Sequence, residues 1–189
     1  MEASYLDEEF DGRVFVGDEL QGIEFENCHF TRCNFESLSF QGSSFINCRF
    51  QDCNLSNVKL TKTSFQDVQF SGCKMLGLQF DQCNGFGFAI QVNNCLLTHS
   101  NFFQMDLRNS SFLNSQLHGV DFSEAKLSGS KLNGSDLLDA VFEFSDLEKA
   151  NFSDCINLRI DPTKNKLKGA LIPANELAGL LYPFQIRVV

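Results

Sequence analysis

The sequence lacks the long apolar segments that mark a membrane protein or a secreted precursor. No stretch of its 189 residues approaches the ~20 consecutive apolar residues that a membrane-spanning helix requires. The first ten residues, MEASYLDEEF, are acidic and contain no apolar core typical of a signal peptide. The sequence therefore predicts a cytoplasmic protein that does not associate with membranes.

Linkers and catalytic motifs are also missing. No segment between Phe10 and Phe152 is rich in Pro, Gly or Ser, so we expect one continuous core rather than two. The chain contains no GxSxG nucleophile motif, no phosphate-binding loop and no HExxH zinc motif. Its three histidines, His29, His99 and His118, are not accompanied by a local nucleophile. These absences predict a protein that is not an enzyme and that holds no cofactor and no metal ion.

Basic residues are few. The chain has 15 Lys and Arg residues against 24 Asp and Glu residues, and its formal net charge is −9. Phosphate binding needs clustered basic side chains, so the composition argues against direct binding to nucleic acid. A basic partner, or simple solubility, explains the excess of acid better. The acidic residues concentrate in residues 1–26 and 121–154.

What the sequence does contain is a repeat of five residues. Between Gly42 and Phe70 a bulky apolar residue returns at every fifth position, and a smaller residue stands two positions before each one. Three residues of strand-like alternation are thus followed by two that must turn a corner. Four such units form a square coil of about 20 residues, which stacks on further coils because one unit cannot bury its own apolar side.

The repeat extends in both directions from this segment. We call the bulky position the large slot and the smaller position the small slot. The first run of large slots comprises Phe10, Phe15, Leu20, Phe25, Phe30, Phe35, Phe40, Phe45, Phe50, Leu55, Leu60, Phe65, Phe70, Met75 and Phe80. After a slip of two residues at 81–96, the second run comprises Leu97, Phe102, Leu107, Phe112, Leu117, Phe122, Leu127, Leu132, Leu137, Phe142, Leu147 and Phe152. We expect a solenoid over residues 1–160 with these side chains in its core.

Units such as FSEAKL, LSGSKL, LNGSDL and LEKANF resemble the A(D/N)LXX pattern of pentapeptide-repeat proteins, over about residues 8 to 160. The resemblance implies an all-β fold, the right-handed quadrilateral β-helix of that family. The general right-handedness of parallel strand crossovers points the same way. The resemblance implies less about function, since one fold hosts many roles.

Cysteines and phenylalanines follow the same geometry. The cysteines in the small slot are Cys28, Cys33, Cys48, Cys53, Cys73, Cys95 and Cys155. We expect free buried thiols in a reducing compartment rather than disulfides. The large-slot phenylalanines should stack in aromatic columns at the ~4.8 Å spacing of neighbouring strands.

The segment Asp81–Cys95, DQCNGFGFAIQVNNC, contains the two extra residues, and its two glycines permit a bulge or a short loop. It can be interpreted in two ways. An exposed aromatic loop would bind a partner, whereas a plain corner would still send Phe86 or Phe88 into the core. The plain corner is the prediction that we carry forward.

Residues 161–189 depart from the strict repeat. Asp161 followed by Pro162 predicts a capped turn. The stretch KGALI predicts one last repeat, with Ala170 in the small slot and Ile172 in the large slot. The stretch PANELAGLLY that follows predicts a short helix.

The end of this tail is rich in apolar residues. Phe184, Ile186 and Val188 alternate with other residues, which predicts a strand. The candidate dimer interface comprises Leu177, Leu180, Leu181, Phe184, Ile186 and Val188. The tail either caps the open end of the solenoid or joins two chains. We expect a homodimer, because this apolar surface exceeds what one end of a square coil needs.

Function should reside on the outward positions of the repeat. The candidate partner-binding surface comprises Asp121, Glu124, Asp136, Asp139, Glu143, Asp146, Glu148 and Asp154. The chain also resembles the Qnr-type quinolone-resistance proteins and their mycobacterial relatives, in which repeats are followed by a dimerising C-terminal segment. There an acidic rod-shaped dimer imitates duplex DNA and engages DNA gyrase or topoisomerase IV, so the resemblance implies topoisomerase inhibition or quinolone protection. The long loops that interrupt the coils of the Qnr type are absent here.

The alternative is a generic pentapeptide-repeat scaffold that binds another protein through the flat sides of the helix. The distribution of charge separates the two hypotheses. A continuous acidic stripe along one side would favour DNA mimicry, whereas charge confined to the two ends would favour the scaffold.

Overall fold

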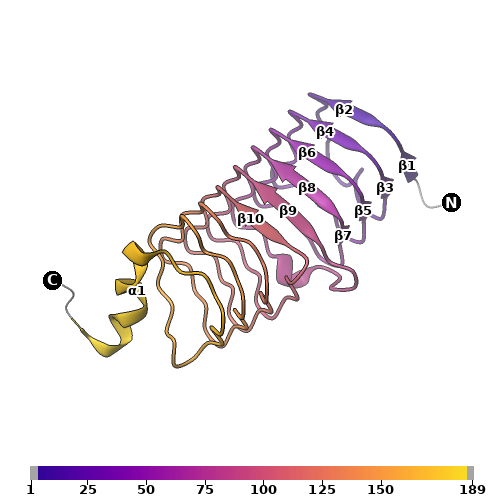
Figure 1. Cartoon of the computed structure of the whole chain (residues 1–189). Coiled ribbons are helices and arrows are strands. Elements are labelled where there is room, and N and C mark those ends of the chain that lie inside the picture. Colours follow the sequence, from indigo (N-terminus) through magenta and orange to yellow (C-terminus); the bar gives the residue numbers. More distant parts are fainter. Residues whose placement is uncertain (1–3, 187–189) are drawn as a thin grey trace.

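The computed structural model describes residues 4–186 and shows a β-solenoid with a short helical tail at its C-terminal end (Figure 1). Strands in successive coils run parallel and pair in register, Phe25 with Phe45 and Phe30 with Phe50. Backbone hydrogen bonds connect each coil to the next along the whole repeat. The structure confirms the quadrilateral β-helix that the five-residue repeat predicts.

The coil has four sides, which the chain visits in the order A, B, C and D. Face A contains the four-stranded sheet of β1 (Ser4–Leu6), β3 (Glu24–Glu26), β5 (Ser44–Ile46) and β7 (Ser64–Gln66). Face B contains the six-stranded sheet of β2 (Glu9–Asp11), β4 (His29–Thr31), β6 (Arg49–Gln51), β8 (Val68–Ser71), β9 (Ile90–Asn93) and β10 (Ser111–Leu113).

Single paired residues, rather than strands, connect the coils on the rest of the surface. Face C runs through such pairs from Val14 to Ile156, and face D runs from Ser39 to Val141. Face A continues towards the C-terminus through Asp106, Lys126, Asp146 and Lys166, and face B continues through Lys131, Asn151 and Leu171. Each face is therefore a ladder of outward positions, with one rung for each coil.

Large-slot side chains fill the interior, and every large-slot residue of the two predicted runs from Phe10 to Phe80 and from Leu97 to Phe152 is buried, whereas Ile172 of the last predicted repeat is partly buried. Rings one coil apart stack face to face, with centroids 4.6 Å apart for Phe30 and Phe50 and 5.0 Å apart for Phe25 and Phe45. Both separations lie in the range that favours aromatic packing. The predicted aromatic columns are confirmed.

All eight cysteines are free thiols, and the seven in the small slot are buried. Their Sγ atoms donate to backbone carbonyl oxygens, as Cys53 does to Phe30 of the preceding coil at 3.3 Å. Burial raises the pKa of Cys48 to about 12, so this thiol stays protonated and unreactive near neutral pH. Cys83, in the irregular segment, is only partly buried.

The two extra residues lie between Phe80 and Ile90, before the chain returns to register in β9. A 3₁₀ helix, η1 (Phe80–Gln82), and a turn replace the regular corner. Phe88 is buried and its ring meets that of Phe80 edge-on at 6.1 Å. Phe86 is instead 81% exposed. The predicted corner is confirmed through Phe88, while Phe86 projects into solvent.

The tail starts as predicted. The backbone N–H of Thr163 donates to Asp161 Oδ1 at 2.8 Å, which caps a turn. Lys166 and Leu171 then pair with the coil below, so KGALI forms a last, incomplete coil. Three short helices follow, the 3₁₀ helix η2 (Ala174–Glu176), α1 (Ala178–Leu181) and the 3₁₀ helix η3 (Tyr182–Phe184). Within residues 4–186 none of the helices is long and apolar enough to cross a membrane.

The strand predicted over Phe184, Ile186 and Val188 is wrong where the structure describes it. Phe184 closes η3, and Gln185 adopts the left-handed conformation with φ 55°. Pro183 favours this helical turn, because its ring fixes φ and it has no N–H to give to a ladder. Val188 lies outside the described residues.

Substitutions of the buried Phe50 and of the exposed Phe86 should have different effects on stability. Phe50→Ala should lower the free energy of unfolding by about 3–5 kcal/mol, because it leaves a cavity in an aromatic column. Phe50→Lys should prevent folding, because it places a charge there. Thermal and urea denaturation followed by circular dichroism measure both effects. Phe86→Ala is the control and should leave stability unchanged; a soluble Phe50→Lys protein with the parent's melting curve would contradict the register.

Candidate functional site

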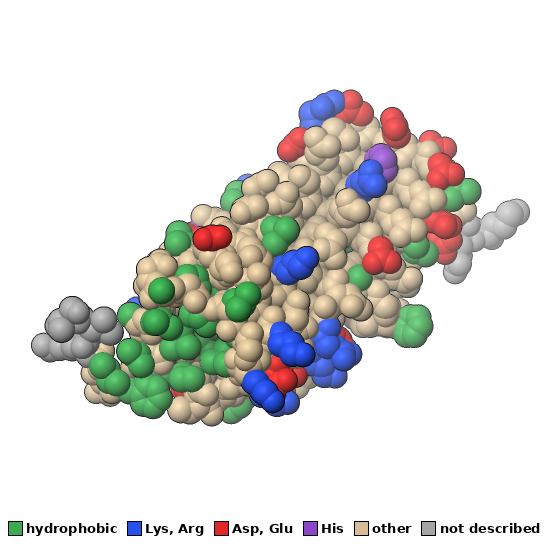
Figure 2. Space-filling model, in the orientation of Figure 1, with side chains coloured by type: hydrophobic (Ala, Val, Ile, Leu, Met, Phe, Trp, Pro, Cys, Tyr) green, Lys and Arg blue, Asp and Glu red, His purple; other side chains and the backbone are tan. Residues whose placement is uncertain are grey.

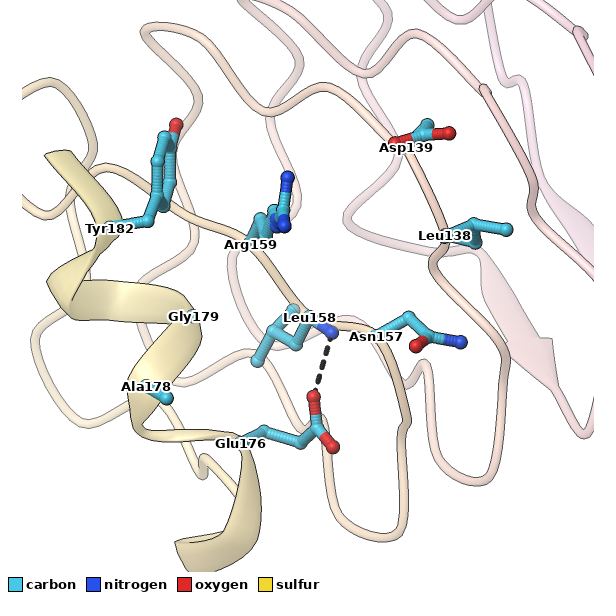
Figure 3. Close-up of a pocket in the computed structure, with 9 residues that line it drawn as sticks. All are labelled: Leu138, Asp139, Asn157, Leu158, Arg159, Glu176, Ala178, Gly179 and Tyr182. Atoms are coloured by element: carbon cyan, nitrogen blue, oxygen red, sulfur yellow. Dashed lines mark hydrogen bonds between the residues drawn. The ribbon is translucent and has the colours of Figure 1, made fainter. Parts of the chain in front are cut away.

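The tail lies across the last coils of the solenoid and forms hydrogen bonds with their open backbone (Figure 3). Glu176 Oε2 accepts a hydrogen bond from the backbone N–H of Leu158 at 2.9 Å. The backbone N–H of Ile160 donates to the carbonyl oxygen of Gly179 at 3.2 Å. These two contacts satisfy donors that a further coil would otherwise bind, so the tail caps this side of the open end.

Gly179 makes the close approach of α1 possible. A Cβ atom added there would stand 1.6 Å from the carbonyl oxygen of Leu158, which is far inside van der Waals contact. No neighbouring flexible side chain can relieve this clash, because the obstructing atoms belong to the backbone of Leu158 and Arg159. Only glycine lets the helix sit where it does.

Two adjoining hollows flank the contact between tail and coil. The first has a volume of about 290 Å³ and the second about 260 Å³, and Asp139, Arg159 and Tyr182 line both. The guanidinium of Arg159 lies 5.9 Å from the centre of the Tyr182 ring, a distance at which a cation is attracted to the ring face. The hollows are open grooves between tail and solenoid rather than an enclosed pocket.

The cap leaves much of the tail's apolar surface uncovered. Leu177, Phe184 and Ile186 of the predicted dimer interface are about half exposed, while Leu180 and Leu181 are partly buried. Val188 lies outside the described residues. Tyr182, which the sequence analysis did not include, is also about half exposed. Figure 2 shows apolar side chains gathered over this end of the molecule.

The eight predicted acidic residues are spread over all four faces. Asp121 and Glu143 are on face D, between Asp139 at the corner before it and Glu124 at the corner after it. Asp136 is on face C, Asp146 and Glu148 are on face A, and Asp154 stands at the corner after face B. The structure therefore brings half of the set together on or beside face D and separates the rest.

Local contacts engage some of these carboxylates. Asp136 accepts hydrogen bonds from His118 Nε2 and from Asn157 Nδ2, both at 2.7 Å. Burial raises the pKa of Asp136, but these hydrogen bonds outweigh it and the net shift is downward. Glu143 Oε1 lies 3.1 Å from Lys164 Nζ, at the C-terminal margin of face D.

Face D combines acid with exposed apolar side chains over several coils. We define the face D patch as Asp121, Glu124, Glu143, Phe103, Val141 and Phe144. The outward positions of the four units that bear it, 79–82, 101–104, 121–124 and 141–144, include no Lys, Arg or His. Burial raises the pKa of Asp81 at the start of this series. An acidic surface with protruding apolar groups is suited to contact a basic protein surface.

Sequence reasoning missed Phe103, Val141 and Phe144. A signal for them was present, because Phe103 and Val141 stand directly beside the large-slot residues Phe102 and Phe142, and Phe144 stands at the corner two positions after Phe142, so that all three occupy outward positions. No ligating cluster accompanies them. Across the described residues 4–186, no three His, Cys, Asp or Glu side chains are grouped as a metal ion would need.

Comparison with known families covers most of the repeat. A model described as a pentapeptide repeat region matches residues 23–91, and one described as pentapeptide repeats (8 copies) matches residues 91–123 and 121–156. The chain belongs to the pentapeptide-repeat family. The shared pattern lies in the two inward slots of each unit, which are the residues that build the β-helix.

Among solved structures, this pentapeptide-repeat protein is similar to QnrB1, a plasmid-mediated fluoroquinolone resistance protein, at 18% sequence identity and a TM-score of 0.47. That match covers 99% of this chain and 100% of the other. HetL, a pentapeptide repeat protein involved in heterocyst differentiation regulation from the cyanobacterium Nostoc, matches at 17% identity and a TM-score of 0.34, over 90% of this chain and 83% of its own. A comparison with curated proteins finds no match.

The contact between the tail and the last coil predicts that one methyl group added at Gly179 will displace α1. Gly179→Ala should displace α1, because its Cβ would collide with the Leu158 carbonyl oxygen. Hydrogen exchange of the Leu158 and Ile160 amides should then accelerate by about tenfold or more, since both lose their acceptors in the tail. Gly85→Ala is the control, because open space surrounds a Cβ there. Unchanged protection of both amides in Gly179→Ala would show that the tail is not docked as described.

Proposed function

We propose that this protein is a non-enzymatic interaction protein whose face D patch binds the basic surface of a protein partner. The observation that supports the proposal is the combination, on one flat face, of half-exposed apolar side chains with the carboxylates of Asp121, Glu124 and Glu143, the last of which is paired with Lys164. Phe103 is 37%, Val141 is 41% and Phe144 is 62% exposed. Carboxylates would steer and align the partner, and the apolar groups would supply the buried contact.

The backbone at Phe144 supports the same interpretation. This bulky residue adopts the left-handed conformation, with φ 58°, at a corner where Asn, Asp or Gly would adopt the same conformation at a lower energetic cost. The conformation costs roughly 1–2 kcal/mol, and burial returns little because the side chain faces solvent. Lys164 Nζ lies 5.9 Å from the centre of the Phe144 ring, and the rest of the exposed ring is available to a partner.

The partner that we propose is DNA gyrase or topoisomerase IV. In the Qnr-type proteins that the sequence resembles, an acidic rod-shaped dimer imitates duplex DNA and engages one of these enzymes. The face D patch would present carboxylates to a basic surface of the enzyme, and the protein itself would not bind nucleic acid. This proposal places the protein in the cytoplasm, and its effect would be inhibition of the enzyme or protection from quinolones.

The proposal includes a homodimer formed through the tail. One side of the tail rests on the last coil, and Leu177, Phe184 and Ile186 remain about half exposed on the other. A self-complementary apolar surface of this kind closes most simply as a two-fold pair. Pairing at the C-terminal ends would place the face D patches of both copies near the middle of a longer rod.

A generic scaffold with a different partner is the second candidate. The observation that favours it is the spread of the acidic residues, because Asp136, Asp146, Glu148 and Asp154 face away from face D. Acid distributed over four sides does not form the continuous stripe of duplex DNA. The scaffold would still use the face D patch, with a basic partner other than a topoisomerase.

Charge neutralisation on one face tests the topoisomerase proposal. The triple variant Asp121→Asn, Glu124→Gln and Glu143→Gln should weaken binding to gyrase by about tenfold or more and flatten its salt dependence. Surface binding measurements and a supercoiling assay, with and without a fluoroquinolone, separate inhibitor from protector. The matched control is Asp146→Asn, Glu148→Gln and Asp154→Asn, which removes the same charge from other faces. Equal losses in both variants, or no effect of the parent at micromolar concentration, would favour the scaffold.

The variant Phe144→Gly should separate the role of this side chain in binding from its role in stability. Glycine removes the left-handed strain of roughly 1–2 kcal/mol and costs about 0.5–1 kcal/mol in backbone freedom, so thermal stability should hold or rise. Binding to the partner should nevertheless weaken. A variant that melts later and binds as well as the parent would remove Phe144 from the interface.

Substitutions in the apolar tail should change the mass of the protein in solution. Phe184→Ser combined with Ile186→Ser should convert the dimer into a monomer without altering the melting of the solenoid, because both side chains are exposed in the single chain. Light scattering at roughly 0.5 M salt measures this mass with long-range charge effects screened. Phe86→Ser, at a more exposed apolar site elsewhere, is the control at this salt concentration. A monomeric parent would contradict the dimer, and a dimer that persists without residues 174–189 would place the interface elsewhere.

A further inference from the structure

Face A has opposite charges in its two halves. On the N-terminal half the charged outward residues are Asp7, Glu24, Glu26 and Asp67, and the positions 4–7, 24–27, 44–47 and 64–67 include no Lys, Arg or His. On the C-terminal half they are Arg108, Lys126, Lys149, Lys166 and Lys168, with Asp106, Asp146 and Glu148 among them. Figure 2 shows basic side chains gathered along this part of the molecule. The net charge of −9 conceals this local excess of base.

A rigid turn projects Phe86 between the two halves. Asn84 Oδ1 accepts a hydrogen bond from the Phe86 N–H at 3.1 Å, and Asn84 Nδ2 donates to Ser64 Oγ of β7 at 3.2 Å. The Phe86 side chain is 81% exposed although the turn beneath it is anchored. A hollow of about 110 Å³ beside the turn is lined in part by Asp106 and Arg108 of the next coil.

We propose that face A pairs with face A of a second copy of this chain, with the two solenoids antiparallel. Consider a two-fold axis that lies in the interface parallel to the strands. It reverses the order of the coils but keeps each residue's position across the face. Glu24 then lies opposite Lys166 and Glu26 opposite Lys168, because each pair occupies equivalent positions in coils equally far from the axis. Symmetry makes each of these contacts twice.

The rest of the face accepts the same register. β5, which has no charged residue, lies opposite the coil of Asp146 and Glu148, and β7 lies opposite the coil of Lys126. No like charges are opposed. The axis passes between the coil of Phe86 and the coil of Arg108, so the aromatic ring of each copy lies against the coil that carries the other's guanidinium. A cation over an aromatic face adds attraction at the centre of the contact.

The chemistry of the face indicates a weak and salt-dependent association. Its ion pairs are exposed, and pairs of this kind contribute little individually and are screened by salt. Its most exposed large apolar side chains, Phe86 and Leu6, stand on separate coils and do not form an apolar core. This pairing uses neither face D nor the tail, so it goes beyond the proposed function and does not depend on it.

Charge swapping tests the pairing on the full-length protein. Sedimentation velocity measures the mass of each protein at roughly 20 mM and at roughly 500 mM salt. Apolar association through the tail should be similar at both concentrations, so the difference in mass reports the charged contact. The parent should show at least twice the mass at low salt that it shows at high salt, because each chain then pairs through face A in addition to any contact between tails. Lys166→Glu with Lys168→Glu, or Glu24→Lys with Glu26→Lys, should each weaken the low-salt association by about tenfold or more, because like charges then meet. An equimolar mixture of the two variants should associate again, since one presents an acidic face and the other a basic one.

The control reverses the same number of charges on another side. Arg49→Glu with Lys131→Glu changes face B, carries the same net charge as the Lys166 and Lys168 variant, and should associate as the parent does. Phe86→Ser should weaken the association several-fold without lowering thermal stability. Equal parent masses at low and high salt, or a mixture of the two charge variants that does not associate, would overturn the proposal.

Discussion

The stacking of one coil on the next is the interaction on which the structure depends. A coil by itself has four short sides, no internal sheet and an apolar interior that it cannot close. Contact with neighbouring coils supplies both the apolar burial and the backbone hydrogen bonds that a single coil lacks. Columns such as Phe30 on Phe50 bury the rings, and the backbone of each coil forms hydrogen bonds with the coil beside it. Burial and hydrogen bonding therefore depend on the same register, and a shift of one residue would expose every column.

That constraint turns the surface into four ladders. Since the inward positions are committed to the core, each coil can vary only its outward positions and corners, and residues of one ladder meet at the spacing of strands. Composition then says little about recognition. Asp121 and Glu124 on face D have no basic neighbours in their ladder, whereas Asp146 on face A is placed between Lys126 and Lys166. The same net charge supports different chemistry on different sides.

The five-residue period made most of the fold predictable. It assigns the residues of the two regular runs, Phe10 to Phe80 and Leu97 to Phe152, to the core or the surface without reference to other chains, and the buried columns agree with it. It could not choose between Phe86 and Phe88, because two extra residues remove the register that would decide. Nor could it predict Gly179, since the fit of α1 against Leu158 is a non-periodic contact. Phe103 and Phe144 were predictable from their outward positions, but a search for charged residues does not identify them.

The two ends of the solenoid differ in how much of their backbone is open to another chain. The C-terminal end is covered in part by the tail, where Glu176 accepts the Leu158 N–H. At the N-terminal end, among the described residues 4–186, β1 pairs only with β3 and β2 only with β4, and an open parallel edge invites another chain. Asp7, Glu8 and Glu9 stand on or beside these edge strands and repel a second copy of the same end. Growth by stacking is thus disfavoured where the backbone would allow it, and recognition is left to the faces and the tail.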